Sequence, residues 1–269
     1  MTFRYLKAAV LDWAGTTVDF GSLAPVVALE RVFAEAGVPV TAGEIREHMG
    51  TLKKDQIRSI CASKRVAQAW RAAHGADPSE TDVERLFQEF LPRQTEILAE
   101  FSRPIPCVPE TVESWRAAGM KIGSSTGYTR ALLDIVMPRA AARGYAPDAS
   151  VTPDEVGGGR PLPFMCYRNA ILLGAWPLWH CVKIGDTPSD VREGRNAGMW
   201  TIGITATGNE IGLPQAEWEA LAPEVRAELE GAAAEVLRGA GAHFVAPSLA
   251  GCTALLDEIE RRIAAGEKP

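Results

Sequence analysis

A short apolar run that ends in an aspartate constrains the fold of this chain more than any other feature. Asp12 follows the apolar residues 8–11, and a Gly-Thr-Thr turn occupies residues 15–17. An apolar run bounded by turn residues predicts a buried strand. Ligands of open α/β sheets bind beyond the carboxyl ends of strands, so Asp12 is placed where chemistry occurs. A carboxylate there can attack an electrophile or bind a metal, although a turn or helix-capping role is the simpler interpretation of Asp12 alone.

Two regions of different character follow this strand. Residues 21–103 have the apolar spacing of helices throughout, whereas residues 104–269 alternate helices with short apolar strands. The alternating pattern is typical of a parallel sheet covered by helices. We therefore predict an α/β core formed by residues 1–20 and 104–269, with an all-helical domain of residues 21–103 inserted after the first strand.

The expected elements of the core can be given with approximate bounds. Strands are expected at residues 121–125, 151–152, 180–184, 200–204 and 243–245, and helices at 109–119, 129–143, 164–173, 189–197, 223–238 and 248–264. In the inserted region one helix begins near Lys53 and another spans residues 64–74. Pro92 is expected to break or kink the helix that carries Phe90, because proline cannot donate a helical hydrogen bond.

Composition excludes several classes of protein. The chain is 46% apolar and 23% charged, as in soluble globular proteins, and its net charge of −6 gives no footprint for nucleic acid or an anionic membrane. No apolar run has the ~18 residues of a transmembrane helix, and the amino terminus lacks the apolar core of a signal peptide. The five cysteines are irregularly spaced, which fits a reduced, cytoplasmic compartment better than a disulfide framework.

Polar residues follow three of the expected strands. Asp12, Thr126 and Asp186 each stand at or just after a strand end, and such ends meet at one edge of a parallel sheet. Asp12 and Asp186 can share a divalent cation, for which Mg²⁺ is the expected metal, and Asp190 can support the same site from the following helix turn. Taken singly, Asp186 and Asp190 are better explained as turn and helix-capping residues.

Phosphate-binding groups accompany these carboxylates. The Thr126 hydroxyl and the Gly127 amide offer uncharged donors near a helix amino terminus, and Arg160 offers a bidentate cation in a glycine-rich loop. A capping threonine and a surface arginine are the simpler explanations when each residue is considered alone. Together with the acidic residues, they favour a site for a phosphoryl group.

The motifs resemble those of the haloacid dehalogenase (HAD) superfamily. The resemblance rests on Asp12-x-Ala14-Gly15-Thr16-Thr17, Ser125-Thr126-Gly127, Arg160-Pro161 and Gly185-Asp186-Thr187-Pro188-Ser189-Asp190, which occur in the family's order. It implies a Rossmann-like core, and the helical insertion stands where the family carries its type I cap. The finer resemblance is to the phosphonatase family, on Asp12 to Asp19, Thr126 to Arg130, Gly159 to Pro161, Met165 to Tyr167 and Gly194 to Trp200.

This resemblance implies a reaction. Phosphonatases hydrolyse the P–C bond of phosphonoacetaldehyde, during degradation of 2-aminoethylphosphonate, to acetaldehyde and phosphate. It implies that Asp12 is the nucleophile and that Lys53 forms a Schiff base with the aldehyde. Ala14 occupies the position where HAD phosphatases have an acid for the leaving group, and its carbonyl oxygen is an expected metal ligand. Lys53 must be neutral to react, and burial or the neighbouring Lys54 would favour this state; a solvated helix lysine is the simpler interpretation of Lys53 alone.

Further residues and alternatives follow from the same resemblance. Met49, Gly50, Tyr128 and Ser22 are expected to contact substrate, and a homodimer through the cap domain is expected. Gln56 stands where phosphonatases have a histidine and cannot titrate, and His48 is a nearby replacement whose simpler role is an exposed helix residue. A HAD phosphatase, a C–P hydrolase acting on another small phosphorylated aldehyde, and a catalytically weak HAD-like binding protein remain as alternative functions.

Overall fold

Strand β1 (Ala8–Leu11) lies near the middle of a six-stranded parallel sheet in the computed structural model, which describes residues 2–269. The strand order is β3–β2–β1–β4–β5–β6, formed with β2 (Lys121–Ser125), β3 (Ala149–Val151), β4 (Cys181–Gly185), β5 (Trp200–Ile204) and β6 (Phe244–Ala246). Ala9 of β1 stands in register with Ile122 of β2 and Val182 of β4. Strands β2 and β3 lie on one side of β1 and strands β4, β5 and β6 lie on the other. Asp12 therefore follows the strand at which the strand order changes direction, where ligands of such sheets bind.

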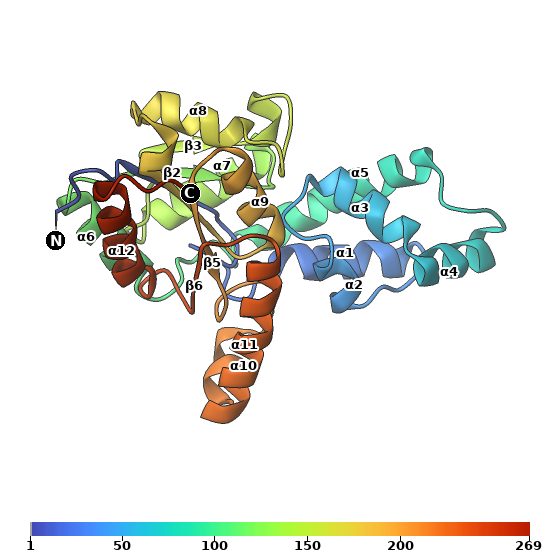
Figure 1. Ribbon diagram of the computed structural model, residues 1–269. Coiled ribbons are helices and arrows are strands. Elements are labelled where there is room, and N and C mark those ends of the chain that lie inside the picture. Colours follow the sequence, from blue (N-terminus) through green and yellow to red (C-terminus); the bar gives the residue numbers. More distant parts are fainter. Residues whose placement is uncertain (1) are drawn as a thin grey trace.

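Successive residues of β1 point to opposite faces of the sheet, as the two-residue period of a strand requires. Ala9 and Leu11 belong to the larger apolar core, and Ala8 and Val10 belong to a smaller one on the other face. The larger core includes α6 (Val108–Ala117), α7 (Arg130–Ala141) and α12 (Cys252–Ala264), and the smaller one includes α8 (Phe164–Leu173) and the residues just after α9 (Pro188–Asn196). The sheet is therefore covered by helices on both faces (Figure 1).

The inserted segment forms a separate helical body beside the sheet (Figure 1). It consists of α1 (Ala24–Glu35), α2 (Ala42–Arg46), α3 (Lys53–Ala62), α4 (Lys64–His74) and α5 (Glu80–Leu98). These helices bury their own apolar cluster, in which Phe33, Ile57, Trp70 and Phe90 are fully or almost fully buried. An all-helical insertion after the first strand agrees with the predicted organisation, and the domain limits at residues 20/21 and 103/104 remain a prediction.

The helix around Pro92 is unbroken, so of the break or kink expected there the break is wrong, and the kink stays a prediction. Helix α5 continues through Pro92 as one element. Its buried residues Val83, Leu86, Phe90, Gln94 and Leu98 recur every three or four positions on both sides of the proline. Packing of this continuous stripe against α1 and α3 outweighs the loss of one backbone donor.

Most core elements agree with prediction to within a few residues, and two helices near the carboxyl end differ more. The last helix, α12, begins at Cys252 instead of Ser248. Helix α10 (Gln215–Ala220) was not expected, since only Trp218 of this short element is buried and it shows no periodic stripe. It precedes α11 (Pro223–Gly239), and the two project together from the sheet (Figure 1).

The inserted helices approach the core at the carboxyl edge of the sheet. Gly50, just before α3, has a φ of +83°, and a side-chain carbon there would lie 2.3 Å from Thr187 Oγ1 at the start of α9. Only glycine allows both this backbone conformation and this close approach. The loop that leads to Lys53 is therefore held directly over the strand ends.

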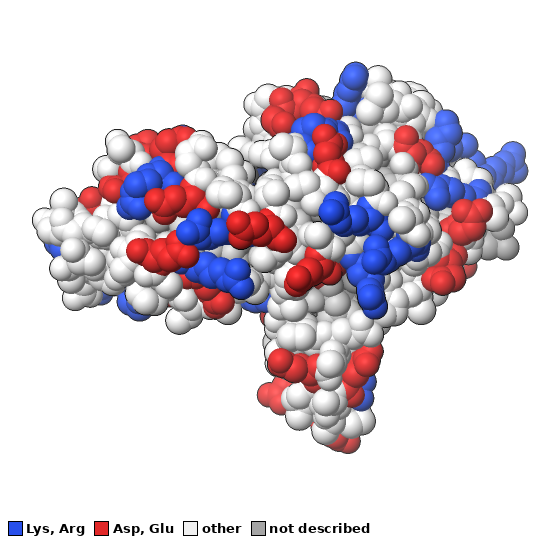
Figure 2. All heavy atoms as spheres, turned by 180° about the vertical axis from the view of Figure 1, so that it is seen from behind, with Lys and Arg blue, Asp and Glu red and all other residues white. Residues whose placement is uncertain are grey.

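Acidic and basic side chains are interspersed over the face shown in Figure 2, including the helical body. The inserted helices also carry surface ion pairs such as Arg58–Glu80 and Lys54–Glu84. Among residues 2–269, no helix is both long and apolar enough to cross a membrane.

Candidate active site

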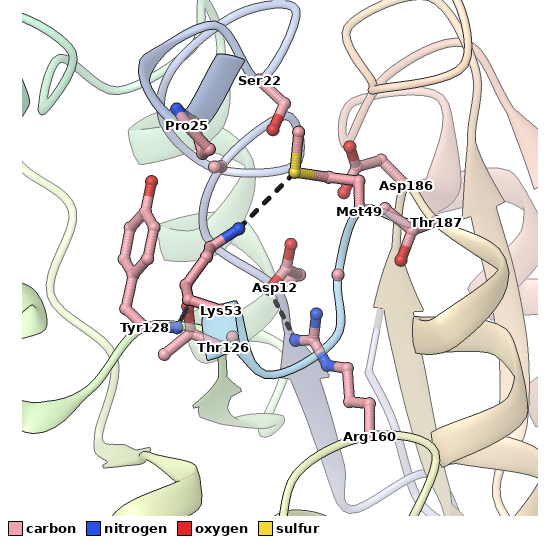
Figure 3. Close-up of a pocket in the computed structure, with 13 residues that line it drawn as sticks. Asp12, Ser22, Pro25, Met49, Lys53, Thr126, Tyr128, Arg160, Asp186 and Thr187 are labelled. Atoms are coloured by element: carbon pink, nitrogen blue, oxygen red, sulfur yellow. Dashed lines mark hydrogen bonds and ion pairs between the residues drawn. The ribbon is translucent and has the colours of Figure 1, made fainter. Parts of the chain in front are cut away.

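A cavity lies between the strand ends and the inserted helices (Figure 3). Every residue that the sequence placed in a nucleophile, Schiff-base, substrate-binding or direct metal-ligand role lines it: Asp12, Ala14, Ser22, Met49, Gly50, Lys53, Thr126, Gly127, Tyr128, Arg160 and Asp186. Pro25 and Thr187 line it as well and were not anticipated. The cavity has a volume of about 20 Å³, which is about enough for one water molecule.

Asp12 stands at the carboxyl end of β1 and is held in place from both sides. Its backbone N–H donates to the Ile184 carbonyl at 2.9 Å, which extends the pairing between β1 and β4. Arg160 Nη2 donates to Asp12 Oδ1 at 2.6 Å, and both side chains are buried. The carboxylate is thus fixed by the sheet and paired with a cation that approaches from another loop.

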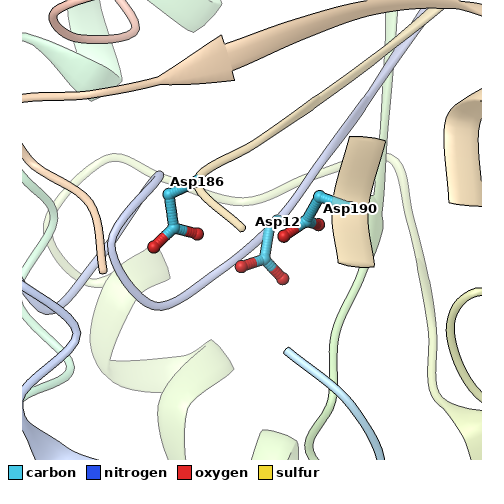
Figure 4. A group of neighbouring side chains, drawn as sticks. All are labelled: Asp12, Asp186 and Asp190. Carbon is cyan, nitrogen blue, oxygen red and sulfur yellow. The ribbon is translucent and has the colours of Figure 1, made fainter. Parts of the chain in front are cut away.

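Asp12, Asp186 and Asp190 form an acidic cluster at this edge (Figure 4). One oxygen atom from each carboxylate lies within 4.8 Å of the others. Asp186 accepts hydrogen bonds from the Asn209 amide at 2.8 Å and from Thr16 Oγ1 at 3.2 Å. Gly15 has a φ of +82°, and a side-chain carbon there would lie 2.2 Å from Asp186 Oδ2. The turn after β1 therefore requires glycine for the two aspartates to come together.

The protonation equilibria of these aspartates reflect their burial. Burial raises the pKa of Asp12, against the lowering effect of Arg160. Burial and the charge of Asp12 raise the pKa of Asp186 well above its usual range. Burial also acts against ionisation of Asp190, but Arg160 and Lys183 beside it lower the pKa of that carboxyl. Asp190 therefore has two buried cations beside it, Asp12 shares only Arg160, and Asp186 pairs with neither of them.

The balance of buried charge fits a divalent cation. Four buried carboxylates face two buried cations, and these groups are Asp12, Asp186, Asp190 and Glu193 on one side and Arg160 and Lys183 on the other. These six groups sum to −2 when all are ionised, and the protonated Lys53 amine, which lines the same cavity, brings the sum to −1. This edge therefore has an excess of negative charge that a bound cation would offset. Closely spaced carboxylate oxygens are the donors that a hard cation prefers. The cluster is therefore able to bind a metal.

Lys53 reaches the same cavity from the first turn of α3 (Figure 3). Its amine donates to Gln56 Oε1 at 2.9 Å and contacts Met49 Sδ at 3.6 Å. Burial lowers the pKa of Lys53 to about 8, against the raising effect of Asp12 and with a lowering contribution from Arg160. At pH 7 about one amine in eleven is therefore neutral, the state that a nucleophilic amine requires.

Lys54 does not contribute to this shift, which corrects the sequence expectation. Its amine pairs with Glu84 at 2.6 Å on the outside of the helical body. Neighbouring residues of a helix point in different directions, so the Lys54 charge is directed away from the cavity. Arg160, which is distant in sequence, is the cation that lowers the pKa of Lys53.

Gln56 is fully buried beneath Lys53, and its amide has a fixed orientation. Its Nε2 donates to the Ile45 carbonyl at 2.9 Å, which leaves Oε1 facing the lysine amine. His48 is partly buried and does not line the cavity. Thus Gln56 supplies an acceptor next to Lys53, and His48 does not occupy the place of a titrating neighbour.

The loop after β2 and the segment before α1 complete the cavity. Thr126 Oγ1 accepts a hydrogen bond from the Tyr128 amide at 3.1 Å (Figure 3). Burial raises the pKa of Tyr128 well above its usual range, so this residue stays a neutral phenol. Ser22 is buried and has a φ of +50°. Both oxygens of Asp19 accept amide hydrogens at the start of α1, at 3.0 Å each, which ties down the segment that carries Ser22.

Sequence reasoning missed two charged groups that surround the predicted site. Lys183 of β4 donates to Asp190 Oδ1 at 2.5 Å, and Glu193 of α9 accepts from Arg160 Nε at 3.0 Å. A lysine within an apolar strand, together with a glutamate one helical turn after Asp190, was the available signal. This pattern would identify Lys183 and Glu193 as buried neighbours of the site only if strand β4 were known to pack against helix α9.

The fold and the residues at the carboxyl edge of the sheet are those of a known class of hydrolase. Residues 6–198 match the family model of haloacid dehalogenase-like hydrolases. The chain belongs to this family and is an enzyme of the hydrolase class, with a Rossmann-like core and an acidic cluster at the family's strand edge.

The names of its relatives indicate a particular reaction within this family. A phosphonoacetaldehyde hydrolase from Syntrophobacter fumaroxidans is 45% identical over 98% of this chain and 95% of its own length. A bifunctional phosphonoacetaldehyde hydrolase/aminoethylphosphonate transaminase from Clostridioides difficile is 46% identical over 95% of this chain and 40% of its own length. The crystal structure of a phosphonoacetaldehyde hydrolase-like protein from Oleispira antarctica, 39% identical, aligns with a TM-score of 0.97 over all of this chain and 98% of that one.

Proposed function

We propose that this enzyme hydrolyses the P–C bond of phosphonoacetaldehyde to acetaldehyde and phosphate. The observation that carries the proposal is the meeting of Lys53 and Asp12 in one closed cavity, next to Ala14. An amine of lowered pKa suits an aldehyde, and a carboxylate beside an arginine suits a phosphoryl group. The names of relatives at 45% and 46% identity support the same substrate.

The reaction begins at the lysine. The neutral amine of Lys53 adds to the aldehyde carbon and water leaves, which gives a protonated imine. The Lys53 amine donates to Gln56 Oε1. The Gln56 amide therefore holds the lysine nitrogen in the cavity during this step. Gln56 has no proton of suitable acidity to transfer, so the amide orients the lysine while the transferred protons come from other groups.

Asp12 then attacks phosphorus. The P–C bond breaks, and its electron pair moves into the imine, so that the departing carbon becomes part of a neutral enamine. The carbon is protonated, hydrolysis of the imine releases acetaldehyde and Lys53, and water cleaves the aspartyl-phosphate to give phosphate. Ala14 carries no acid, and none is needed for a leaving group whose electrons are accepted by the imine.

Arg160, Thr126 and Gly127 are proposed to bind the phosphoryl oxygens, and Ser22, Met49, Gly50 and Tyr128 to enclose the aldehyde end. We propose that Mg²⁺ is held by Asp12, Asp186 and the Ala14 carbonyl, with Asp190 supporting them from its bonds to Lys183 and Thr187. When bound, the ion supplies positive charge for the phosphoryl group and the attacking carboxylate.

The inserted helices are proposed to open and close over this site. The cavity has room for about one water molecule as it stands, which is too little for a phosphonate. The substrate must therefore enter when the helical body moves away from the strand ends, with residues 20–23 and 99–106 as the two connections. Closure then removes water from the imine and from the aspartyl-phosphate.

A product assay tests the proposal. Purified enzyme with phosphonoacetaldehyde and Mg²⁺ is expected to release acetaldehyde and phosphate in equal amounts. Lys53→Arg is expected to abolish release, and Lys54→Arg, its exposed neighbour, is the matched control that keeps it. Equal turnover of a phosphate ester by the wild type and Lys53→Arg would instead assign a phosphatase. Turnover of another phosphorylated aldehyde in preference would assign a related C–P hydrolase, and an absence of turnover with retained ligand binding would assign a binding protein.

We also propose which reaction supplies the substrate and in which compartment the enzyme works. A transamination of 2-aminoethylphosphonate would supply the aldehyde, and the Clostridioides difficile relative joins activities of those two names in one chain. The five cysteines are free, and four of them are buried, which supports a reducing cytoplasm.

We also propose a homodimer, and the exposed apolar side chains indicate which surface forms the contact between the two copies. Among residues 2–269 the exposed large apolar side chains lie outside the inserted helices, and six of the eight fall between Leu162 and Trp176. We therefore favour helix α8 over the cap domain as the contact with a second copy. Ile171→Asp on α8 is expected to convert a dimer to a monomer in light scattering, and unchanged mass would return the contact to the cap.

A further inference from the structure

Glu193 occupies a position that the proposed reaction does not use. It lies on α9, one helical turn after Asp190, and is fully buried. Its Oε2 atom accepts hydrogen bonds from Arg160 Nε at 3.0 Å and from Ser125 Oγ at 2.9 Å. The carboxylate therefore holds the arginine at Nε, whereas the nucleophile Asp12 accepts from Nη2.

The remaining contacts of Arg160 show what this hold achieves. Nη2 donates to Asp12 Oδ1 at 2.6 Å and to the Ser125 carbonyl at 2.9 Å, and lies 3.0 Å from Asp190 Oδ1. Within residues 2–269, Nη1 makes no hydrogen bond. The guanidinium group is planar and rigid, so fixing Nε and Nη2 also fixes the direction of Nη1.

We infer that Glu193, supported by Ser125, is a positioning residue that fixes the plane of Arg160 so that Nη1 is presented to a phosphoryl oxygen. Without it, the guanidinium would be free to turn toward Asp12 and Asp190, which lie within 3.0 Å of Nη2. Such a turn would withdraw Nη1 from the ligand and pair the nucleophile more tightly with a cation. The inference rests on the proposed phosphoryl-binding role of Arg160.

A role in stability alone does not account for Glu193. Its second oxygen, Oε1, is buried and has no hydrogen-bond partner within residues 2–269. A buried carboxylate oxygen without a partner is unfavourable. Lys183 is satisfied mainly by Asp190 at 2.5 Å and lies 3.6 Å from Glu193. The two strong contacts of Glu193 are therefore to Arg160 and to the serine that also holds Arg160.

Binding of inorganic phosphate in the presence of Mg²⁺ tests the inference without requiring turnover. Glu193→Gln keeps the shape of the side chain and removes its charge, and it is expected to weaken phosphate binding about tenfold, since a charge-assisted hydrogen bond is about twice as strong as a neutral one. Ser125→Ala should weaken it in the same direction and by less. Arg192→Gln, an exposed charge on the same helix, is the control and should bind as the wild type does.

A double-mutant cycle separates positioning from general destabilisation. Lysine has no Nε–H, so in an Arg160→Lys background Glu193→Gln should cause little further loss of phosphate affinity. With phosphonoacetaldehyde as substrate, Glu193→Gln should lower kcat as well as raise KM. Equal losses of phosphate affinity in both backgrounds, or no loss in either, would overturn the inference. Failure of the wild type to act on phosphonoacetaldehyde, with the coupling intact, would refute the proposed reaction and leave the role of Glu193 standing.

Discussion

Replacement of Gln56 by glutamate tests how this site lowers the pKa of Lys53. The lowered pKa of Lys53, about 8 against 10.5 for an ordinary lysine, is caused mainly by burial. At pH 7 a pKa of 8 leaves about one amine in eleven neutral, and one of 10.5 leaves about one in 3,000. The buried lysine is thus about 300 times richer in the reactive form.

Gln56→Glu places a carboxylate where Gln56 Oε1 now lies, 2.9 Å from the Lys53 amine. An opposite charge within ~4–6 Å raises the pKa of an amine by about 1–3 units. The neutral fraction at pH 7 should therefore fall by about 10- to 1,000-fold. Gln56→Met is the matched control, because it keeps the volume and the burial without adding a charge, and the pKa of Lys53 should remain well below 10.

The assay is the rate at which borohydride traps the lysine as its imine, measured across pH in a single turnover. For the wild type this rate should rise tenfold per pH unit up to about 8 and then level off. For Gln56→Glu the levelling point should move upward by the shift given above. An inflection that stays near 8 in Gln56→Glu, or a wild-type inflection near 10.5, would refute the reasoning.

Three further predictions concern the absent general acid, the metal and the buried Asp19 carboxyl before α1. Ala14→Asp supplies the missing general acid, and hydrolysis of a small phosphate monoester should rise about 10²-fold in a phosphate-release assay. Removal of metal with EDTA should abolish turnover and Mg²⁺ should restore it; Mg²⁺ should also raise the melting temperature of the wild type, and Asp186→Asn should lose that rise. Burial raises the pKa of Asp19 to about 7, so the folded chain binds more protons than the unfolded chain above pH ~4, and stability falls as pH rises from about 4 through 7. Asp19→Asn should melt at a temperature that varies less over that interval, and an unchanged slope would contradict this cause.

The sequence predicted the sheet and the edge at which the site forms. Short apolar runs bounded by turn residues place β1, β2 and β4 almost to the residue, because strands buried on both faces of a parallel sheet have little freedom in composition. Asp12 and Asp186 follow from those strand ends. By contrast, the continuity of α5 through Pro92 depends on packing against α1 and α3, which no local pattern contains.

The surroundings of the site were less accessible to prediction. Sequence proximity made Lys54 the obvious cation beside Lys53, but helix geometry turns it outward to Glu84. The group that acts on Lys53 is Arg160, which lies more than a hundred residues away in the chain. Glu193 and Lys183 were missed for the same reason, since their pairing depends on how α9 crosses β4.

Mass analysis of the trapped lysine tests the central claim most directly. Wild-type enzyme treated with phosphonoacetaldehyde, Mg²⁺ and borohydride should carry an N-ethyl group on Lys53, because the P–C bond breaks before the imine is released. Asp12→Asn, which cannot attack phosphorus, should instead carry an N-(2-phosphonoethyl) group on Lys53. Full release of acetaldehyde and phosphate with no adduct on Lys53 would contradict the account.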